Sequence, residues 1–541
     1  MRTRFIAALV LLAAASSPRA QEASLPDHVR AAADRITVAQ ITRDLDFLSS
    51  DALLGRATPS PGFDTAANYI ADRLTAAGLK PAGDDGTFFQ HYTMRESTVD
   101  SAASYVEVGG SQLPLGDGVS IVTFAGPLIG TYKAVYVGHG WTVPGKNIDP
   151  YGGVDVRGKI VLAHAPGAMP KGVEIPSLGR ITPGASSVVV EAERRGAAAV
   201  VYIGADMASS VPGQPRTGQS IRRRELEPSV PSAYAAPRVT VLTLSRDGAN
   251  TLLAGEAGGS DAIAKGQAQD YPASFELAKP VTVAIATATS VTHRPFNVVA
   301  ILEGTDPALK AEHITVFSHL DGAVGSRTIG GDAIYNSADD NASGSAGTLS
   351  IAEQMAKAPP KRSIIFVWDS GEEVGLWGTR FFVANSPVPL DRIVTHFNID
   401  MIGANRAPGS ADANEARVTG PNEVFLIGPG VLSARADALL TRVNSLYLKL
   451  GFNRQDDRGD SSFFYPRTDA GPFLERGILT IGFNTGIHDR YHQPSDEARH
   501  LDTGKVTAIA RTVFVSVWML ADAQERPGID KPIPPNVPRY R

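Results

Sequence analysis

The sequence predicts an α/β fold, because apolar runs typical of buried strands alternate with segments of helical periodicity. Between His313 and Asp400 the chain reads as HITVFSHLDG, then the loop NSADDNASG opening a helix, then SIIFVWDS and IVTHFNID. Ligands of an open α/β sheet bind at the carboxyl ends of its strands. The histidines and carboxylates of this stretch lie at or just after the apolar runs, or at the helix start. This placement indicates a metal-dependent hydrolase.

The composition excludes several classes of protein. With 541 residues the chain is too long for one hydrophobic core, so two or more domains are expected. The formal net charge is −5 and no Lys/Arg stripe is interleaved with aromatic residues, so we expect no nucleic-acid partner. The sequence contains no cysteine, which excludes disulfides, thiolate nucleophiles and cysteine-bound zinc. Any metal must therefore be held by His, Asp and Glu.

The first twenty residues have the pattern of a secretory signal peptide. Arg2 and Arg4 precede the apolar run Phe5–Ala15, and small residues lead to Ala20. This run is too short to span a membrane, and no later stretch reaches about 18 uninterrupted apolar residues. We therefore expect residues 1–20 to be removed and the protein to be exported to the periplasm or the extracellular space, with no membrane span.

Residues 21–129 are predicted to belong to the domain that carries the site. Two helices are expected, at 35–50 and 63–77, the second ending at Gly78 as a C-cap. A strand is expected at 88–94, with irregular chain after it.

Residues 130–257 have a different pattern of predicted elements and are predicted to form an inserted, non-catalytic module. Short strands alternate there with Gly/Pro-rich turns and one helix, Ser186–Arg195. The stretch Ala205–Ala236 is rich in Pro, Ser and Arg, which predicts that it is largely loop. His139 and His164 are isolated from other ligand-type residues, so structural roles are expected for both.

Residues 258–525 return to the strand–helix alternation and are predicted to form the metal-binding domain. A strand is expected at Phe296–Leu302, a helix at 432–450 and another strand at Ile478–Phe483. From residue 526 to the end at 541 the chain is broken by five prolines, so an extended surface segment is expected.

His319 and Asp321 form the first candidate pair. The apolar run before His319 predicts a strand, so the imidazole emerges at the strand end, and Asp321 points to the same side. A metal site combines such an imidazole ligand with a carboxylate that fixes the orientation of the ring.

Two acidic pairs follow at positions suited to metal chemistry. Asp339 and Asp340 open a helix about twenty residues after His319. Glu372 and Glu373 lie just past the next strand. Neighbouring side chains at a turn diverge, so one glutamate can bind a metal while the other faces the attacking water.

Asp400 and a histidine near residue 490 complete the candidate set. Asp400 ends an apolar strand, where a carboxylate is costly unless a positive group meets it. His492 lies in the sequence YHQP beyond a later strand, and His488 is its local competitor. Two histidines and four carboxylates on separate loops can supply two metal ions that share one bridging carboxylate. Oxygen and imidazole ligands suit zinc, with manganese or cobalt as substitutes.

Six motifs carry a resemblance to a known family: HLD, ADDNASG, SGEEVGLWGT, NIDMIG, RTDAGPFLERGI and YHQPSDE. Together they resemble the secreted di-zinc aminopeptidases, bacterial leucyl-aminopeptidase-like metallopeptidases of the same clan as glutamate carboxypeptidase. The similarity covers about residues 35–100 and 290–520 in the family's order. It implies a three-layer α/β/α fold with a mixed sheet of the zinc-exopeptidase type.

The resemblance also implies the metal ligands. Asp340 would bridge two zinc ions, His319 and Asp400 would complete one site, and Glu373 and His492 the other.

Further site residues follow from the same resemblance. Glu372 would be the general base, Tyr491 would hydrogen-bond the oxyanion, and Met401 and Arg467 would lie near the substrate. The peptide bond between Asp340 and Asn341 would be cis.

The sequences VDVRGKIVLAHAPG and ERRGAAAVVYIG are similar to a protease-associated domain. The resemblance thus implies a smaller, β-rich insertion at 130–257 that shapes substrate access. It would divide the peptidase domain into residues 21–129 and 258–525.

The family resemblance implies an exported di-zinc aminopeptidase that hydrolyses N-terminal residues from peptides through a metal-bridging hydroxide. A carboxypeptidase or dipeptidase of the same clan would need a basic clamp, which Arg380, Arg406, Arg454 and Arg458 could supply. A glutaminyl cyclase would use similar ligands with a single zinc. A non-catalytic binding protein would have lost ligands, whereas here all five ligands and the base are present.

Overall fold

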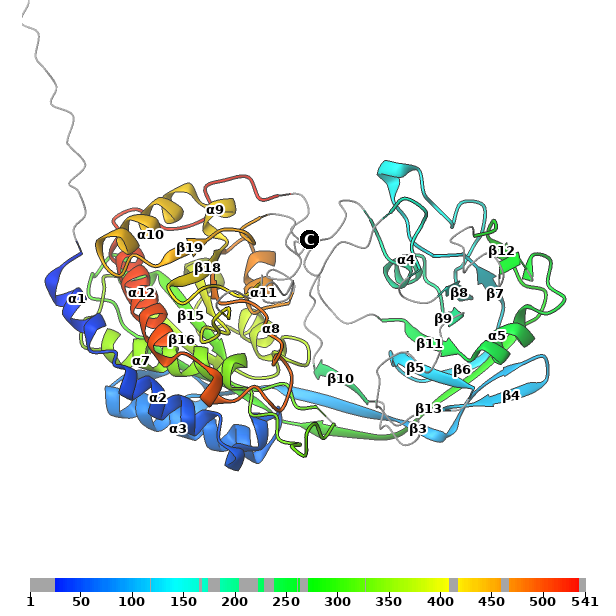
Figure 1. Ribbon diagram of the computed structural model, residues 1–541, viewed down its shortest axis with the longest axis horizontal. Coiled ribbons are helices and arrows are strands. Elements are labelled where there is room, and N and C mark those ends of the chain that lie inside the picture. The colour runs from blue at the N-terminus through cyan, green and yellow to red at the C-terminus, as the bar shows by residue number, and fades with distance from the viewer. Residues whose placement is uncertain are drawn as a thin grey trace, which may run out of the picture.

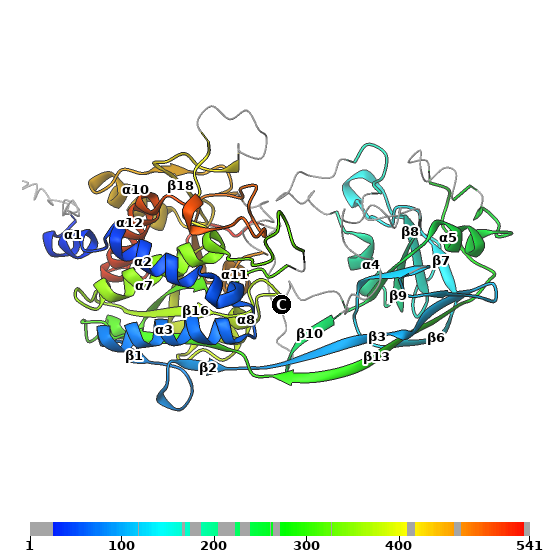
Figure 2. The same cartoon turned by 60° about the horizontal axis from the view of Figure 1, so that its bottom comes forward.

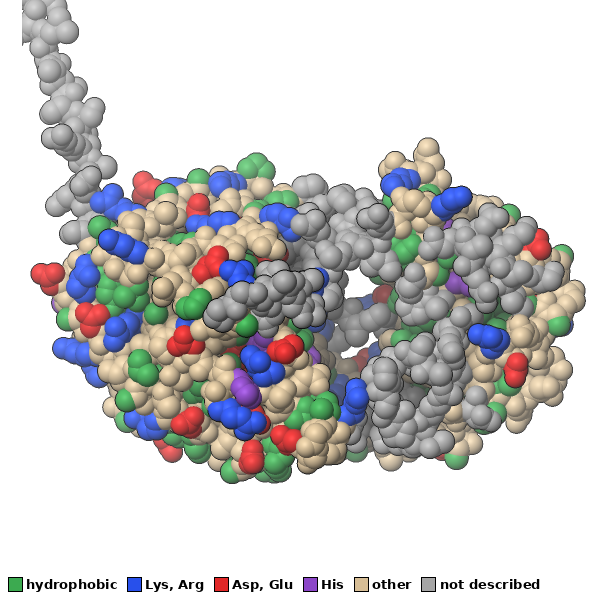
Figure 3. All heavy atoms as spheres, viewed as in Figure 1, with side chains coloured by type: hydrophobic (Ala, Val, Ile, Leu, Met, Phe, Trp, Pro, Cys, Tyr) green, Lys and Arg blue, Asp and Glu red, His purple; other side chains and the backbone are tan. Residues whose placement is uncertain are grey.

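The computed structural model describes residues 25–116, 118–164, 168–173, 185–203, 222–227, 238–259, 261–262, 271–325, 327–407, 417–458 and 467–534. The predicted signal peptide, residues 1–20, lies outside these residues. The described chain forms two lobes joined by a long two-stranded ribbon (Figures 1 and 2). On the face shown in Figure 3, Lys/Arg and Asp/Glu side chains are interspersed over the larger lobe.

The larger lobe is built on a nine-stranded sheet with the strand order β1-β14-β16-β15-β17-β20-β18-β19, and β2 pairs with β14 beside this path. Its strands are β1 (Lys80–Pro81), β2 (Phe89–His91), β14 (Phe296–Leu302), β15 (His313–His319), β16 (Ser363–Asp369), β17 (Ile393–Ile399), β18 (Glu423–Ile427), β19 (Gly451–Asn453) and β20 (Leu479–Asn484). The central strands β16, β15, β17 and β20 run parallel. Their carboxyl ends therefore meet at one edge of the sheet.

Helices cover both faces of this sheet, so the lobe has three layers. One face carries α1 (Asp27–Asp34), α2 (Val38–Leu48), α3 (Pro61–Ala77), α7 (Gly344–Met355), α9 (Pro429–Leu432), α10 (Ala434–Leu446) and α12 (Thr503–Asp522). The other face carries α8 (Trp377–Ala384) and α11 (Ala470–Glu475). The predicted three-layer α/β/α architecture with a mixed sheet is thus confirmed.

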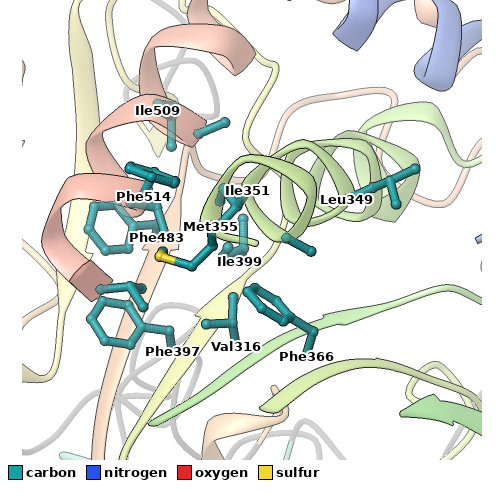
Figure 4. Close-up of a cluster of buried hydrophobic side chains, with 14 of the residues drawn as sticks. Val316, Leu349, Ile351, Met355, Phe366, Phe397, Ile399, Phe483, Ile509 and Phe514 are labelled. Atoms are coloured by element: carbon teal, nitrogen blue, oxygen red, sulfur yellow. The ribbon is translucent and has the colours of Figure 1, made fainter. Parts of the chain in front are cut away.

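The alternation of side chains along the strands explains the two cores. Successive residues of a strand point to opposite faces. Val316 of β15 accordingly packs with Met355 of α7 and Phe514 of α12 on one face (Figure 4). Phe317, the next residue, stacks edge-on against Phe382 of α8 at 5.0 Å between ring centroids. β15 is buried along its whole length, as expected for a parallel strand covered on both faces.

Helix α12 is long and apolar enough to cross a membrane by length and composition, but 78% of its most apolar window is buried in the lobe. It packs against α7 and α10, as a core helix does.

The smaller lobe contains two sheets that pack face to face. The five-stranded sheet has the order β10-β3-β13-β6 with β4 beside β3, and the six-stranded sheet has the order β12-β7-β8-β9-β11-β5. The bounds are β3 (Thr93–Val108), β4 (Ser111–Pro114), β5 (Val119–Thr123), β6 (Leu128–Tyr132), β7 (Ala134–Tyr136), β8 (Ile160–His164), β9 (Ala199–Ile203), β10 (Arg222–Glu227), β11 (Thr240–Leu244), β12 (Phe275–Glu276), β13 (Val281–His293), α4 (Val188–Arg194) and α5 (Arg246–Leu253). An apolar cluster that includes Val106, Leu162 and Val283 fills the space between the sheets. The interval 130–257 lies inside this lobe, flanked by β3 and β13.

Short turns of helix complete the described elements. They are η1 (Asp51–Arg56), η2 (Asp84–Gly86), η3 (Pro144–Lys146), η4 (Leu309–Ala311), the π-helical turn η5 (Ala338–Ser343), η6 (Leu390–Arg392) and η8 (Ala498–His500).

One local expectation was wrong. The chain after Met94 is not irregular, because β3 continues to Val108 and pairs with β13 along most of its length. Within 205–236, where largely loop was expected, the described residues 222–227 form β10 against β3. In both segments the pairing with a strand that is distant in sequence imposes the extended conformation.

Candidate metal centre

All the predicted ligands lie at the edge of the sheet where the parallel strands end. His319 is the last residue of β15, and Asp400 follows β17 directly. Glu373 lies in the loop between β16 and α8, and His492 in the loop that follows β20. Because these strands are parallel neighbours, residues distant in sequence converge at one place.

Three of them form a first group of ligand atoms. The Nε2 atom of His319 lies 3.2 Å from Oδ1 of Asp340 and 3.3 Å from Oδ1 of Asp400. One ligand atom from each of the three residues lies within 4.8 Å of the others, so one cation fits among them. His319 and Asp340 are buried.

A second group shares Asp340 with the first. The Nε2 atom of His492 lies 3.1 Å from Oδ2 of Asp340 and 3.0 Å from Oε2 of Glu373. The ligand atoms of this group also lie within 4.8 Å of one another. Asp340 therefore directs its two carboxylate oxygens to different histidines, which is the geometry of a bridging ligand.

The turn that carries Asp340 is held from behind. The peptide bond between Asp340 and Asn341 is cis, as the resemblance implied. The carboxylate of Asp496 accepts the backbone N–H groups of Asp339, at 3.0 and 3.1 Å, and of Asp340, at 3.1 Å. The Nε2 atom of His488 lies 3.2 Å from Oδ2 of Asp339. His488 thus pairs with Asp339, and His492 is the histidine that joins the ligand group.

Asp321 braces two neighbouring elements. The Nδ1–H of His319 donates to the backbone carbonyl of Asp321 at 3.0 Å, whereas the carboxylate of Asp321 is 3.9 Å from the same nitrogen. The carboxylate instead accepts the backbone N–H of Glu372 at 3.2 Å. The ring of His319 is therefore oriented by a carbonyl group, and the Asp321 carboxylate fixes the loop that begins at Glu372.

The two ligand groups open into a cavity of ≈ 160 Å³. Glu372, Met401, Arg467 and Tyr491 line this cavity together with the ligands Asp340, Glu373, Asp400 and His492. The ring of Tyr491 stacks on that of His492 with the centroids 3.6 Å apart. Every residue that the sequence suggested for catalysis or substrate contact therefore lies at this cavity.

Burial and the close spacing of the carboxylates shift the pKa values of the groups in this cluster. Burial raises the pKa of the Glu372 carboxyl well above its usual range, and His319 offsets only part of this. Burial and the charge of Asp340 raise the pKa of Glu373 to about 8. Burial opposes the charged form of His492, but Asp340 and Glu373 raise its pKa to about 10. The cluster thus retains protons to balance its negative charge, and divalent cations would displace them.

The donor set fits zinc. All ligand atoms are carboxylate oxygens and imidazole nitrogens, which zinc accepts at tetrahedral or slightly larger coordination number. In addition, Oε1 of Glu373 is buried without a hydrogen-bond partner among the described residues. Buried carboxylate oxygens are normally paired, so this atom is available to a cation.

The sequence reading missed several supporting residues. Arg56 is fully buried and donates to the backbone carbonyls of Leu48, Leu320, Asn336 and Ser337. It thereby ties the N-terminal segment to the loops of His319 and Asp340. No local pattern marks Arg56, because its partners lie far along the chain.

Asp369, Thr379 and Asp469 form a second unanticipated cluster. The hydroxyl of Thr379 lies 2.8 Å from Oδ2 of Asp369 and also contacts Oδ1 of Asp469. Asp469 and Asp496 both lie inside motifs that carry the resemblance, and this position is the sequence feature that could have indicated a role for them near the site.

The fold and this site define a class, the metal-dependent hydrolases with a three-layer α/β/α domain. Comparison with known proteins specifies it further: residues 297–517 match the family described as Peptidase family M28. The match runs from β14 into α12, so this part of the larger lobe is similar to that family.

Individual proteins are also similar to the chain. Leupeptin-inactivating enzyme 1 of Streptomyces exfoliatus is 25% identical over 369 residues, which cover 63% of this chain and 72% of that protein. An aminopeptidase of Pseudomonas aeruginosa strain UCBPP-PA14 is 32% identical over 152 residues, which span 27% of this chain and only 25% of the relative. The structure of an aminopeptidase from Aneurinibacillus sp. strain AM-1 shares the fold, with a TM-score of 0.53, 19% identity and coverage of 95% of this chain and all of that one.

Proposed function

We propose that the protein is a zinc-dependent aminopeptidase that removes N-terminal residues from peptides. The observation that carries this proposal is the pair of ligand groups sharing Asp340, with Glu372 in the same small cavity. Several relatives are named aminopeptidases, which supports the same activity.

We assign one zinc ion to His319, Asp340 and Asp400, and a second to Asp340, Glu373 and His492. Manganese or cobalt could replace zinc with this donor set. When bound, the two ions would supply Lewis acidity and lower the pKa of a water molecule between them.

The residues around the ligands would then divide the work of hydrolysis. Glu372 lines the cavity and belongs to neither ligand group, so it would take the proton from the attacking water and pass it to the leaving amine. Tyr491 would donate its hydroxyl proton in a hydrogen bond to the oxyanion of the tetrahedral intermediate. The burial and surrounding carboxylates that keep the pKa of Tyr491 far above its usual value would leave this phenol protonated. Met401 and Arg467 would contact the substrate.

The lining of the cavity offers little that would bind a free carboxylate. Arg467 is the one arginine among its described lining residues, and of its four carboxylates Asp340, Glu373 and Asp400 are the proposed zinc ligands, which leaves Glu372. Of the arginines considered as a carboxypeptidase clamp, Arg454 is paired with Asp437 and Asp457, and neither it nor the others lines the cavity.

We further propose export after removal of residues 1–20, on the sequence pattern of that segment. We also propose that residues 130–257 form a protease-associated insertion between the two parts of the peptidase domain, 21–129 and 258–525, followed by the proline-rich segment 526–541. The β-rich lobe that contains residues 130–257 supports this division.

The test is hydrolysis of a panel of aminoacyl-nitroanilides by the purified protein, with and without a chelator and with zinc added back. Chelator-sensitive cleavage of at least one substrate is expected, together with about two zinc ions per chain. Cleavage of C-terminal residues only would indicate a carboxypeptidase. Cyclisation of N-terminal glutamine by a protein that contains one zinc ion per chain would indicate a glutaminyl cyclase. No turnover of any substrate would contradict catalysis altogether.

A further inference from the structure

A second cavity adjoins the candidate metal centre and has a different character. Its volume is ≈ 520 Å³, and it shares Glu373 and His492 with the smaller cavity, so both cavities border the second ligand group. Besides these residues, Asp321, Pro59, Val324 and Val374 line it. A peptide whose scissile bond lies at the ligands can therefore extend into both cavities.

Part of the wall of this larger cavity is formed by exposed apolar side chains. The side chains of Val324 and Val374 are 50% and 37% exposed, among the few large apolar residues of the lobe that are not covered. Pro59 and Ala323 continue the same wall. Exposed apolar side chains that line a cavity beside a reaction centre are typical of a subsite for an apolar side chain.

The smaller lobe contributes a cation to this cavity. Arg224 lines it and belongs to β10, which lies between the two lobes (Figures 1 and 2). Two residues further along β10, Leu226 packs with Met94, Tyr92 and Trp377 in a buried cluster that joins the lobes. Residues two apart in a strand point to the same face, so the packing of Leu226 turns Arg224 toward the larger lobe.

Two contacts hold the guanidinium of Arg224 in place. Its Nε donates to Oε2 of Glu96, the residue directly opposite on β3, at 2.6 Å. Its Cζ lies 6.0 Å from the ring centroid of Trp377, the first residue of α8. The side chain is only 27% exposed. Among the described residues Glu96 is the one hydrogen-bond partner of this guanidinium and it bonds Nε, so the four N–H donors of the Nη atoms can meet a carboxylate.

We propose that this cavity, formed by the apolar wall of Val324 and Val374 and closed by Arg224, binds the leaving-group side of short peptides. The residue after the scissile bond would place an apolar side chain on the valine wall, and the C-terminal carboxylate would meet Arg224. The protein is then selective for short peptides with a free C-terminus, and the smaller lobe supplies the residue that selects them. This inference rests on the proposed aminopeptidase activity and adds its substrate class.

The charge of the larger cavity agrees with this direction of binding. Arg224 gives this cavity a positive end for the free carboxylate. Asp321 and Glu373 also line the larger cavity, but Glu373 is an expected zinc ligand and the carboxylate of Asp321 is engaged by the N–H of Glu372.

The experiment compares peptides Xaa-Leu, Xaa-Leu-Leu and Xaa-Leu-Leu-Leu with their C-terminal amides, Xaa being the best residue in the nitroanilide panel. The measured quantity is the ratio of kcat/KM for the acid over the amide at each length. In the wild-type protein we expect this ratio to reach roughly tenfold or more at the length that places the carboxylate at Arg224. In Arg224→Gln the ratio at that length should fall to about one, and Arg224→Lys should retain part of it.

Arg223→Gln is the matched control, because Arg223 is the neighbouring residue of β10, pairs with Glu225 and does not line the cavity. Its ratios should equal those of the wild type.

A wild-type ratio near one at every length, or a ratio that Arg224→Gln leaves unchanged, would overturn the inference. Chelator-sensitive nitroanilide turnover, measured on the same samples, reports folding and the proposed activity separately. If the wild-type protein shows this turnover but no preference for the acid over the amide, only the proposed subsite is rejected. If the wild-type protein shows no such turnover, the proposed aminopeptidase activity is rejected. Should Arg224→Gln fail to fold, inhibition of the wild type by leucyl-leucine and by its amide gives the same comparison, and equal inhibition would count against the subsite.

Discussion

At the scale of single residues, the two glutamates after β16 lie side by side in sequence but in different surroundings. Oε2 of Glu373 lies 3.0 Å from the imidazole of His492, within a ligand group, whereas Glu372 belongs to neither group and lines the cavity. The backbone N–H of Glu372 is held by the carboxylate of Asp321. A one-residue step along the loop therefore separates a residue of a ligand group from one that lines the cavity outside both groups.

This difference predicts the behaviour of Glu372→Gln. Zinc content should remain near that of the wild type while kcat falls by about 10²–10⁴-fold, since the substitution removes a proton acceptor but no ligand. Metal analysis of the dialysed protein and nitroanilide kinetics measure the two effects. Glu373→Gln is the matched control and should lose zinc as well as activity. Loss of zinc from Glu372→Gln to the same extent would mean that the roles are exchanged.

Arg56 shows how a residue without ligand or substrate contact can shape the site. Its guanidinium is fully buried and satisfies four backbone carbonyls from three segments of chain. Burial lowers its pKa to about 10, while Asp321 and Asp496 favour the charged form, so it remains protonated at neutral pH.

Arg56→Met should therefore destabilise the larger lobe. The carbonyls of Leu320 and Ser337 would lose their donor, and a buried unpaired polar group costs about 1–3 kcal/mol. We expect the free energy of unfolding in denaturant to fall by about 2–4 kcal/mol. Arg30→Met is the control, because Arg30 donates to a single carbonyl, that of Leu446, at an exposed position. Equal stability of the two variants would contradict this role.

At the scale of secondary-structure elements, the parallel strands were accessible from the sequence and the ribbon was not. β15, β16 and β17 are continuous apolar runs, because each is covered on both faces. Such runs predict buried strands. His319, Glu372 and Asp400 lie at or just after their ends, and this position predicts where the site lies.

β3 lacks such a signal over much of its length. The segment VDSAASYV has small and polar residues where a strand usually has β-branched ones, and it becomes a strand through pairing with β13. The same limit applies to Arg224, whose place at the cavity depends on the pairing of β10 with β3. The choice between His488 and His492 likewise needed three dimensions, because Asp339 and Asp340 point to different sides of their turn.

β17 also carries a buried histidine that makes stability depend on pH. His396 stacks on Phe473 at 4.0 Å, Thr315 contacts its Nδ1, and its Nε2 has no hydrogen-bond partner among the described residues. Burial lowers the pKa of His396 well below its model-peptide value. The unfolded chain thus binds a proton near pH 6.5 that the folded chain does not bind.

The free energy of unfolding should therefore decrease as the pH falls below about 6.5, because protons then favour the unfolded state. His396→Phe keeps an aromatic ring against Phe473 but cannot titrate, so its free energy of unfolding should depend less steeply on pH in this range. Chemical denaturation of both proteins between pH 7.5 and 5, spanning the histidine range at about 6.5, measures the two slopes. Identical slopes would show that His396 is not the group responsible.

At the scale of the whole molecule, the ligands belong to one lobe only. They come from five places between His319 and His492, and none lies in the smaller lobe. A ligand that binds only the folded state stabilises it by mass action, so zinc should act on the larger lobe alone.

Removal of metal should consequently have a local signature. With a chelator, amide hydrogen exchange should become faster in η5 and in the loop around His492, while exchange in β8 and β9 of the smaller lobe should not change. Adding zinc should reverse the effect, and the Glu373→Gln variant should respond more weakly to both treatments. Equally faster exchange in both lobes would indicate that the smaller lobe also depends on the metal.

The two strands of the ribbon, β3 and β13, connect the smaller lobe to the larger one. Met94 and His293 are direct partners at its base, and the backbone N–H of Tyr92 donates to Pro295 at 2.9 Å. The chain therefore leaves the larger lobe and re-enters it at adjacent points, and Leu226 adds a packing contact between the lobes against Trp377. A gene in which residues 95–292 were replaced by a two-residue hairpin turn would encode every strand of the nine-stranded sheet. The proposed selection by Arg224 would then be inherited separately from the larger lobe, whereas the valine wall would stay with the proposed metal ligands.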